Sequence, residues 1–184
     1  MAQRIVDLVI KEFPKKEKRA FKKCQTKNIS LTANPLANAK AVESYIKDLQ
    51  KRVIALGLNP YYGWYLATVY GKQAETILTK MDDFKDNQPA IALARAEAWF
   101  GVHHEMVNRA DDFFVRRTGR LYFDIGSIAS IREAVLADLQ TYLGWDANRL
   151  AKEIDYLDEL IYDATHYYEA ELMANGSKEA VIYA

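Results

Sequence analysis

The segment Asn108-Arg-Ala-Asp-Asp-Phe-Phe-Val-Arg-Arg-Thr-Gly119 places two acids, two adjacent phenylalanines and two adjacent arginines within one short helical pattern. Asn108 is a good helix N-cap, and Gly119 is a residue at which a helix can end. Phe113 and Phe114 point to adjacent faces of such a helix, so part of it is expected to be buried. The arginines are then expected to lie close to that buried region.

The charged residues of this segment allow two interpretations. Asp111 lies in the first turn, beside the positive end of the helix, and Asp112 and Arg116 stand four residues apart in the favourable acid-first order. Arginine is favoured in buried ion pairs, at interfaces and against phosphate. Because ion-pair networks also arise for purely structural reasons, we favour a structural ion pair that flanks a core helix.

The composition fits a globular protein with one core. Of the 184 residues, 50% are apolar and 27% are charged, and the formal net charge is zero. The charge is uneven: residues 1–27 hold nine Lys/Arg against three Asp/Glu, and residues 146–184 hold three against nine. The basic stretch lacks the interleaved aromatic residues of a base-stacking surface, and a neutral chain is a poor binder of phosphates. We expect no nucleic-acid partner.

A cytoplasmic location is expected. The single cysteine, Cys24, cannot form an internal disulfide and lies in a lysine-rich stretch, as in a reducing compartment. No run approaches the roughly 20 apolar residues of a membrane span, so no integral membrane segment is expected. The N-terminus also lacks the apolar core of a signal peptide.

Apolar residues recur at helical spacing through almost the whole chain, which predicts an all-α domain of about seven helices. Helical patterns cover residues 2–13, 36–56, 60–70, 72–84, 90–100, 108–118, 130–143 and 146–175. Residues 28–32 alternate apolar and polar side chains, so a short extended segment is the alternative there. Residues 119–126 are expected to form an aromatic connection.

Capping residues mark the expected helix ends. Asn34-Pro35 and Asn59-Pro60 each place an Asn cap before a proline at the first helical position. Ser130 and Glu133 have the spacing of a capping box, which predicts a helix start at Ser130. The expected stops are Gly57, Gly71 and Gly144.

Motifs that carry chemistry are absent from the sequence. Neither G-x-G-x-x-G nor G-x-x-x-x-G-K-[ST] occurs, so the chain has no nucleotide fingerprint. The run His103-His104-Glu105 has metal-ligating residue types, but adjacent residues do not converge on one ion, and the pair Asp163 and His166 has no second motif beside it. Cys24 has no histidine near it in sequence to act as a base. We expect no metal site and no catalytic residue.

The aromatic run Tyr61-Tyr62-Gly-Trp64-Tyr65 also has two interpretations. Its helical spacing favours core packing. Tyr and Trp are enriched at interfaces, so a ligand pocket or a partner surface is the alternative.

Three groups of residues resemble the C-terminal helical domain of FAD-dependent glycerol-3-phosphate oxidases and dehydrogenases. They are Ala67-x-x-Tyr70-Gly71, Ala96-Glu97 with Val102-x-x-Glu105-Met106, and Asp111-Asp112-x-x-x-Arg116-Arg117-Thr118. The resemblance runs from the first helix to about residue 172. The Phe113-Phe114 pair and the continuation to Phe123 look closer to the bacterial soluble alpha-glycerophosphate oxidases.

This resemblance implies a non-catalytic part of an enzyme that oxidises glycerol 3-phosphate to dihydroxyacetone phosphate and, as an oxidase, reduces oxygen to hydrogen peroxide. In that family FAD and substrate are bound by an N-terminal part of the same polypeptide. No residue of this chain matches those sites, so the chain is expected to bind no FAD and to show no turnover by itself. The alternatives are the corresponding part of a dehydrogenase with a quinone acceptor and a free-standing helical interaction module.

The same resemblance implies an organisation along the chain. Residues 1–35 are expected to be a connecting helix and an irregular segment that pack on the flavin-binding part. Residues 36–175 are expected to form the helical domain, and residues 176–184 a tail. Asp112, Arg116 and Arg117 are the residues expected to hold the domain together or to hold it to its partner domain.

Overall fold

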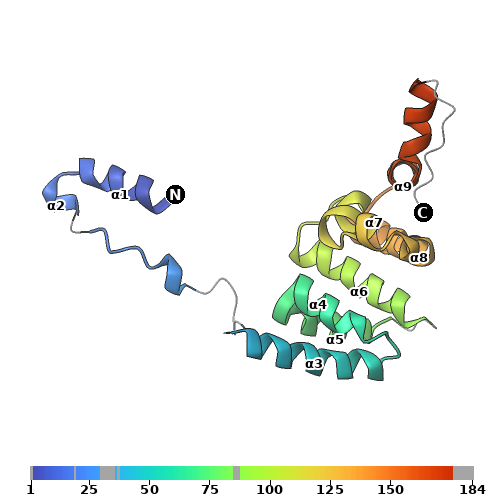
Figure 1. Cartoon of the computed structure of the whole chain (residues 1–184), viewed down its shortest axis with the longest axis horizontal. Helices are drawn as coiled ribbons and strands as arrows, with labels where there is room; N and C mark the ends of the chain where they lie inside the picture. Colours follow the sequence, from blue (N-terminus) through green and yellow to red (C-terminus); the bar gives the residue numbers. More distant parts are fainter. Residues whose placement is uncertain (1, 19, 30–35, 37, 85–87, 176–184) are drawn as a thin grey trace. The chain divides into compact units, whose positions relative to one another are not determined.

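The structure is a computed structural model that describes residues 2–18, 20–29, 36, 38–84 and 88–175, with side chains as far as His166. Two compact units make up the chain, Met1–Ala37 and Asn38–Ala184. All regular structure in the described residues is helical, which confirms the predicted all-α fold (Figure 1). No helix among these residues is both long enough and apolar enough to cross a membrane.

The N-terminal unit contains the helix α1 (Ala2–Glu12), the single turn α2 (Lys15–Lys18) and the 3-10 turn η1 (Thr26–Asn28). Helix α1 ends just before Pro14, as the sequence predicts. Four of its apolar side chains remain more than half exposed, namely Ile5 58%, Val6 55%, Leu8 59% and Val9 53%. Of the predicted extended segment, Ile29 has extended backbone angles, and residues 30–32 lie outside the described part of the chain.

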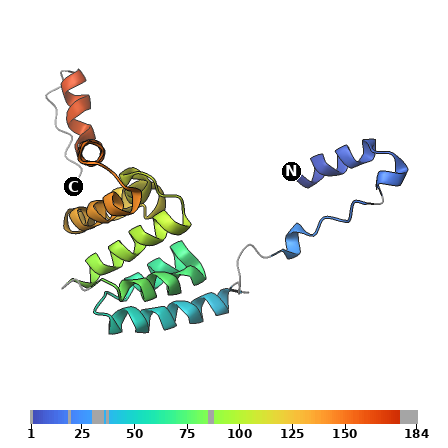
Figure 2. The same ribbon diagram turned by 180° about the vertical axis from the view of Figure 1, so that it is seen from behind.

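The second unit is a stack of helices in sequence order (Figure 1). Helix α3 forms one outer layer, α4 and α5 lie on it, α6 follows, and α8 and α9 complete the stack; the same order is visible from behind in Figure 2. The bounds are α3 Ala39–Ala55, α4 Tyr61–Tyr70, α5 Ala74–Met81, α6 Pro89–His104, α8 Ile125–Leu143 and α9 Ala147–Asn175. Helix α9 is kinked at His166.

Helix α6 lies in the middle of this stack because apolar residues occur on every side of it. Its alanines are small enough to let α5 and α8 approach it from two sides, and Ala92, Ala94, Ala96 and Ala98 are almost completely buried. One charged residue, Glu97, is buried among them with 1% of its surface exposed. A charge in such a place requires partners, since an unpaired buried carboxylate would be very unfavourable.

The main apolar cluster forms where α6, α8 and α9 meet the segment around Phe113 and Phe114. Both phenylalanines are fully buried and pack edge to face, with 5.0 Å between ring centroids, as their sequence context predicts. Helix α8 contributes Ile131, Val135 and Leu139, and α9 contributes Leu157.

Two of the predicted helix starts differ from the structure. Helix α3 begins at Ala39 with Asn38 as its cap, whose Oδ1 accepts from the Ala41 N–H at 2.9 Å; residues 34 and 35 lie outside the described residues. Helix α8 begins at Ile125, so the capping box predicted at Ser130 is wrong. Ser130 lies inside the helix, where its hydroxyl donates to the Ser127 carbonyl at 2.8 Å.

The early start of α8 follows from the segment before it. The predicted connection contains one helical turn, α7 (Arg120–Phe123), and the Ser127 N–H and hydroxyl both bond to the Asp124 carbonyl, at 3.0 Å and 2.9 Å. The cap at Asn59 is confirmed, because its side chain accepts from the Tyr61 N–H at 2.9 Å. The predicted glycine stops follow α3, α4 and α8 with positive φ, namely Gly57, Gly71 and Gly144.

Candidate functional site

The segment Asp112–Arg117 is a π-helix, η3, rather than the α-helix that its spacing predicts. Its wider turn is closed by the Thr118 N–H, which donates to the Phe113 carbonyl five residues earlier at 3.0 Å, and the Thr118 hydroxyl donates to the same oxygen at 2.8 Å. Segments of this kind are rare and occur often at functional sites. Gly119 follows with φ 64°, which ends the helix as predicted.

The π-helical turn lets Arg116 reach two carboxylates. In an α-helix the residues three and four positions away lie on the same side, but the wider turn brings the fifth position close as well. Arg116 accordingly forms ion pairs with Asp111, at 2.5 Å, and with Asp112. The predicted pair between Asp112 and Arg116 is therefore present.

Asp112 also closes the start of this helix, a task that the sequence assigned to Asn108. Its Oδ2 accepts from the Asn108 N–H at 3.0 Å and from the Arg109 N–H at 3.1 Å. Partial burial opposes ionisation of this carboxyl, but these hydrogen bonds and the Arg116 guanidinium outweigh burial and lower the pKa of Asp112. The carboxylate is therefore charged at neutral pH.

A second layer of ion pairs joins the start of this segment to α9. Glu153 is buried, and its carboxylate accepts from the Ala110 N–H at 2.8 Å and pairs with Arg149 at 2.6 Å. Arg109 lies between the buried carboxylates of Asp111 and Glu153, at 3.2 Å and 3.6 Å. The segment is thus fixed to α9 by charged groups as well as by the phenylalanines.

Arg117 does not join this network, although the sequence grouped it with Asp112 and Arg116. Its side chain is exposed and has no ion pair or hydrogen bond with the side chains that the structure describes. Every other arginine between residues 38 and 175 pairs with a carboxylate. These paired arginines are Arg52, Arg95, Arg109, Arg116, Arg120, Arg132 and Arg149.

A buried polar cluster that sequence reasoning missed lies on the other side of the segment. Arg120, at the start of α7, donates to the Glu97 carboxylate at 2.7 Å, and the side chains of both residues are almost fully buried. The other Glu97 oxygen accepts from the hydroxyls of Tyr65, at 2.7 Å, and Tyr70, at 3.0 Å. The isolated glutamate Glu97 in an alanine-rich helix could have indicated a buried charge. Its partners could not be identified from sequence, because they are more than 20 residues away along the chain.

This cluster fixes the protonation states of its members. Burial, together with the charge of Glu97, raises the pKa of Tyr65 and of Tyr70 far above the ordinary value, so both remain neutral hydrogen-bond donors. Burial alone would lower the pKa of Arg120, but the Glu97 carboxylate outweighs burial and raises it. A buried ion pair with two neutral hydrogen-bond donors results.

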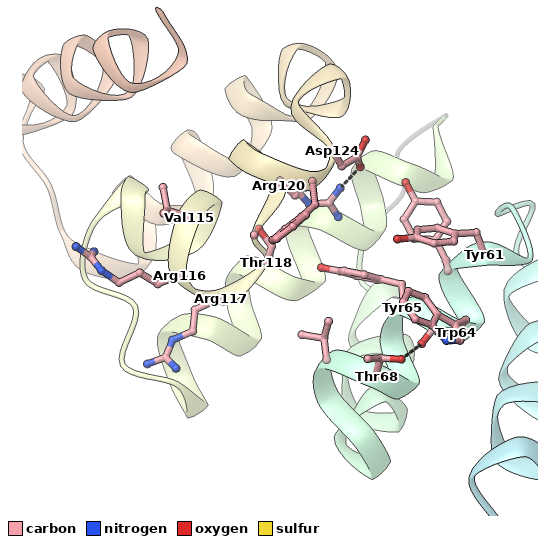
Figure 3. A pocket seen from close by; sticks show the side chains of 14 residues that line it. Tyr61, Trp64, Tyr65, Thr68, Val115, Arg116, Arg117, Thr118, Arg120 and Asp124 are labelled. Carbon is pink, nitrogen blue, oxygen red and sulfur yellow. Dashed lines mark hydrogen bonds and ion pairs between the residues drawn. The ribbon is translucent and has the colours of Figure 1, made fainter. Parts of the chain in front are cut away.

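A cleft of about 450 Å³ opens beside this cluster (Figure 3). Helix α4 forms one side of it with a row of aromatic residues, and residues 115–124, from η3 to the end of α7, form the other. Tyr65 and Arg120 link the cleft to the buried cluster, and Arg116 and Arg117 lie at its far side (Figure 3). The aromatic run is therefore only partly core: Tyr61 and Trp64 are 56% and 46% exposed.

The histidines considered above as metal ligands pack against aromatic rings. His103 stacks on Trp99 with 5.1 Å between centroids, and His104 stacks on Phe100 with 4.7 Å. His166 stacks on Tyr162 rather than meeting Asp163. Among the described residues no group of His, Cys, Asp or Glu side chains is arranged to hold a metal ion.

Comparison with known proteins identifies the family of this chain. A family model described as the C-terminal domain of alpha-glycerophosphate oxidase matches residues 24–150. The chain belongs to this family. The match contains α3 to α8, the π-helical segment, the cleft and the buried Glu97–Arg120 pair.

The curated proteins that this chain resembles are longer than the chain. The chain is 32% identical to the aerobic glycerol-3-phosphate dehydrogenase of Bacillus subtilis (strain 168), over 89% of the chain and 30% of that protein. It is 30% identical to the enzyme of the same name from Staphylococcus haemolyticus, over 84% of the chain and 28% of that protein. The chain therefore spans less than a third of the length of these curated relatives.

A solved structure has the same fold. It is the X-ray structure of the glycerol-3-phosphate dehydrogenase from Bacillus halodurans complexed with FAD, with a TM-score of 0.69 and 26% sequence identity. The superposition covers 88% of this chain and 32% of that one. The likeness thus extends beyond residues 24–150 at one or both ends of the family match.

Proposed function

We propose that this chain is the C-terminal, non-catalytic domain of an FAD-dependent enzyme that oxidises glycerol 3-phosphate to dihydroxyacetone phosphate. The observation that carries the proposal is the family match over residues 24–150. The relative from Bacillus subtilis is named for this activity, and the chain covers 30% of its length. The remaining part of such a polypeptide supplies the flavin and substrate sites. Flavins carry the hydride chemistry of such enzymes, and the protein positions them.

The residues of this chain do not fit a flavin site. The glycine fingerprint that lets a backbone approach a pyrophosphate is absent from the sequence, and the described residues contain no strand to precede it. We therefore assign no catalytic or cofactor-binding residue to the chain. It should bind no FAD and show no turnover by itself.

The role that we assign to the domain is structural. Asp112 accepts from the Asn108 N–H at the start of the π-helical segment and pairs with Arg116 near its end, so the two side chains stabilise this segment. Arg117 remains available to a partner domain. Residues 1–35 are assigned to the contact with the flavin-binding part. The exposed apolar side chains of α1 support that assignment, because such a face is covered in a stable protein.

Two electron acceptors distinguish the candidate activities. The oxidase passes two electrons and two protons from glycerol 3-phosphate to oxygen and gives hydrogen peroxide, in keeping with the name of the family. A dehydrogenase passes them to another acceptor such as a quinone, and the names of the curated relatives favour this second candidate.

The test compares the isolated chain with the full-length polypeptide that contains it. We expect flavin absorbance and glycerol 3-phosphate oxidation in the full-length protein and neither in the isolated chain. The yield of hydrogen peroxide per substrate oxidised then separates the oxidase from the dehydrogenase. A flavin-coloured isolated chain, or a full-length protein without this activity, contradicts the proposal.

A further inference from the structure

The cleft between α4 and residues 115–124 has walls of different chemistry (Figure 3). The wall from α4 presents the rings of Tyr61, Trp64 and Tyr65. The opposite wall carries three arginines, and Figure 3 shows the guanidinium groups of Arg116 and Arg117 on the side away from α4. An occupant therefore meets aromatic surface on one side and positive charge at the far end.

Both walls are held in place from within the domain. Tyr65 is fixed by its hydrogen bond to the buried Glu97 carboxylate, and Arg120 is fixed by the same carboxylate. The turn between the walls is fixed by Thr118, which donates twice to the Phe113 carbonyl. Because these side chains are already ordered, binding of a partner costs little of their conformational entropy.

The rim of the cleft exposes large aromatic side chains. Phe123, which lines the cleft, is 89% exposed, and Trp64 on the opposite wall is 46% exposed. The neighbouring Tyr122 is 66% exposed. Exposed aromatic side chains beside a cleft favour an interaction site, since Trp and Tyr are frequent among the residues that dominate interface energy.

Charge identifies the kind of occupant. Arg116 and Arg120 already pair with carboxylates of the domain, so their charges are compensated. Arg117 has no such partner among the described side chains and lies exposed in the lining of the cleft. A carboxylate is the complementary group, and it would pair with Arg117 while apolar side chains beside it cover Trp64 and Phe123.

We propose that the cleft docks a carboxylate-bearing apolar segment of the same polypeptide, from the part that precedes this chain. This inference rests on the proposed function, because that function supplies the preceding part. The chain covers only 30% of the Bacillus subtilis relative, so most of such a polypeptide lies outside it. A covalently tethered segment has an effective concentration on the order of millimolar, so even modest contacts keep it docked.

Zero-length cross-linking tests the proposed ion pair. In the full-length polypeptide, Arg117→Lys replaces the guanidinium by an amine that a carbodiimide couples to a carboxylate in contact with it. We expect mass spectrometry to find Lys-to-carboxylate links from position 117 to a residue upstream of this chain. The pair of Lys51 and Asp48, 3.5 Å apart, is the internal positive control. Links from position 117 only to carboxylates of this chain, or only between two copies, overturn the proposal.

Hydroxyl-radical footprinting tests coverage of the cleft independently. Oxidation of Trp64 and Phe123 should fall several-fold from the isolated chain to the full-length protein, and the fall should be independent of protein concentration. Tyr162, 55% exposed on α9, is the reference residue. Arg117→Glu should restore much of the oxidation at Trp64, whereas Arg117→Lys should not. Unchanged oxidation at both aromatic residues, or protection that appears only as concentration rises, contradicts docking by the same polypeptide.

Flavin content and glycerol 3-phosphate oxidation of the same full-length preparation separate this inference from the proposed function. An active flavoprotein with an uncovered cleft overturns the docking alone. A covered cleft with a position-117 link in a protein that lacks this activity overturns the proposed function alone.

Discussion

The Arg120 guanidinium donates to the Glu97 carboxylate at 2.7 Å in the interior of the domain, and this contact joins α7 to the central helix α6. Two tyrosine hydroxyls on α4 complete the environment of the carboxylate. One buried charge therefore fixes three elements, and these elements include both walls of the cleft. Loss of either charge should affect folding more than loss of any exposed ion pair.

Removal of one charge of this pair should destabilise the domain strongly. Arg120→Met leaves the Glu97 carboxylate buried without a cation, and Glu97→Gln leaves the guanidinium with only the half-exposed Asp124 carboxylate, at 3.3 Å. Each change should lower the free energy of unfolding by about 3–5 kcal/mol, as for other buried ion pairs that lose one partner. Urea unfolding of the 184-residue chain, followed by circular dichroism, measures the change.

The double variant Glu97→Gln/Arg120→Met supplies the control. The glutamine oxygen still accepts from the tyrosines and no unpaired charge remains, so the double variant should be more stable than Arg120→Met alone. If the loss of unfolding free energy in the double variant equals the sum of the losses in the two single variants, the two side chains are not coupled.

Arg116→Ala should destabilise the π-helical segment in the full-length protein. Arg116 bridges Asp111 and Asp112, and its loss leaves the buried Asp111 carboxylate with Arg109 as its only cation. We expect the Tm in differential scanning calorimetry to fall by a few degrees. Lys51→Ala removes an exposed ion pair and should leave the Tm unchanged. An unchanged Tm for Arg116→Ala would sink the assigned role.

The helices and the buried phenylalanines could be predicted from sequence because they depend on local periodicity. The π-helical form of Asp112–Arg117 could not, since its spacing of Asp112 and Arg116 is equally good for an α-helix. The link between Glu97 and Arg120 depends on how α6 and α7 meet in space, and no local pattern encodes that meeting. The start of α8 is not predictable from local sequence for a related reason, because the turn of α7 fixes where the helix begins.

The close approach of α3 and α4 depends on Gly63. A Cβ at this position would lie 2.6 Å from the backbone nitrogen of Gln50, and neither backbone can move away without separating the helices. Gly63→Ala should therefore lower the free energy of unfolding by about 1–3 kcal/mol, the usual cost of overpacking. Thermal and urea unfolding of the isolated chain measure it.

Gly126→Ala is the matched control for Gly63→Ala. Gly126 lies in α8, and nothing lies within 4 Å of the Cβ that an alanine would add. Alanine should stabilise the helix there by about 0.5–1 kcal/mol, since glycine loses more backbone entropy on folding. Equal effects of the two substitutions would show that the contact with Gln50 is not tight.

Buried tyrosines should make the domain sensitive to alkaline pH. Burial, and then the charge of Glu75, raise the pKa of Tyr45 from 10.0 to about 12, and Tyr65 and Tyr70 have pKa values raised further by burial and by Glu97. Because the folded state holds these protons more tightly than the unfolded state, their contribution to stability is complete below pH 10 and is lost as the pH rises through the folded pKa values. The free energy of unfolding should accordingly fall between pH 10 and about pH 12.

Tyrosine-to-phenylalanine variants locate the source of this alkaline loss. Tyr45→Phe and Tyr65→Phe each remove one ionisable group and keep the ring, so the fall of the free energy of unfolding above pH 10 should be shallower in each variant than in the wild type. Tyr65→Phe should also lower the stability at neutral pH, because Glu97 then loses a hydrogen-bond donor. Urea unfolding at a series of pH values measures the slopes, and equal slopes in the wild type and both buried-tyrosine variants would show that these hydroxyls are free to ionise in the folded state.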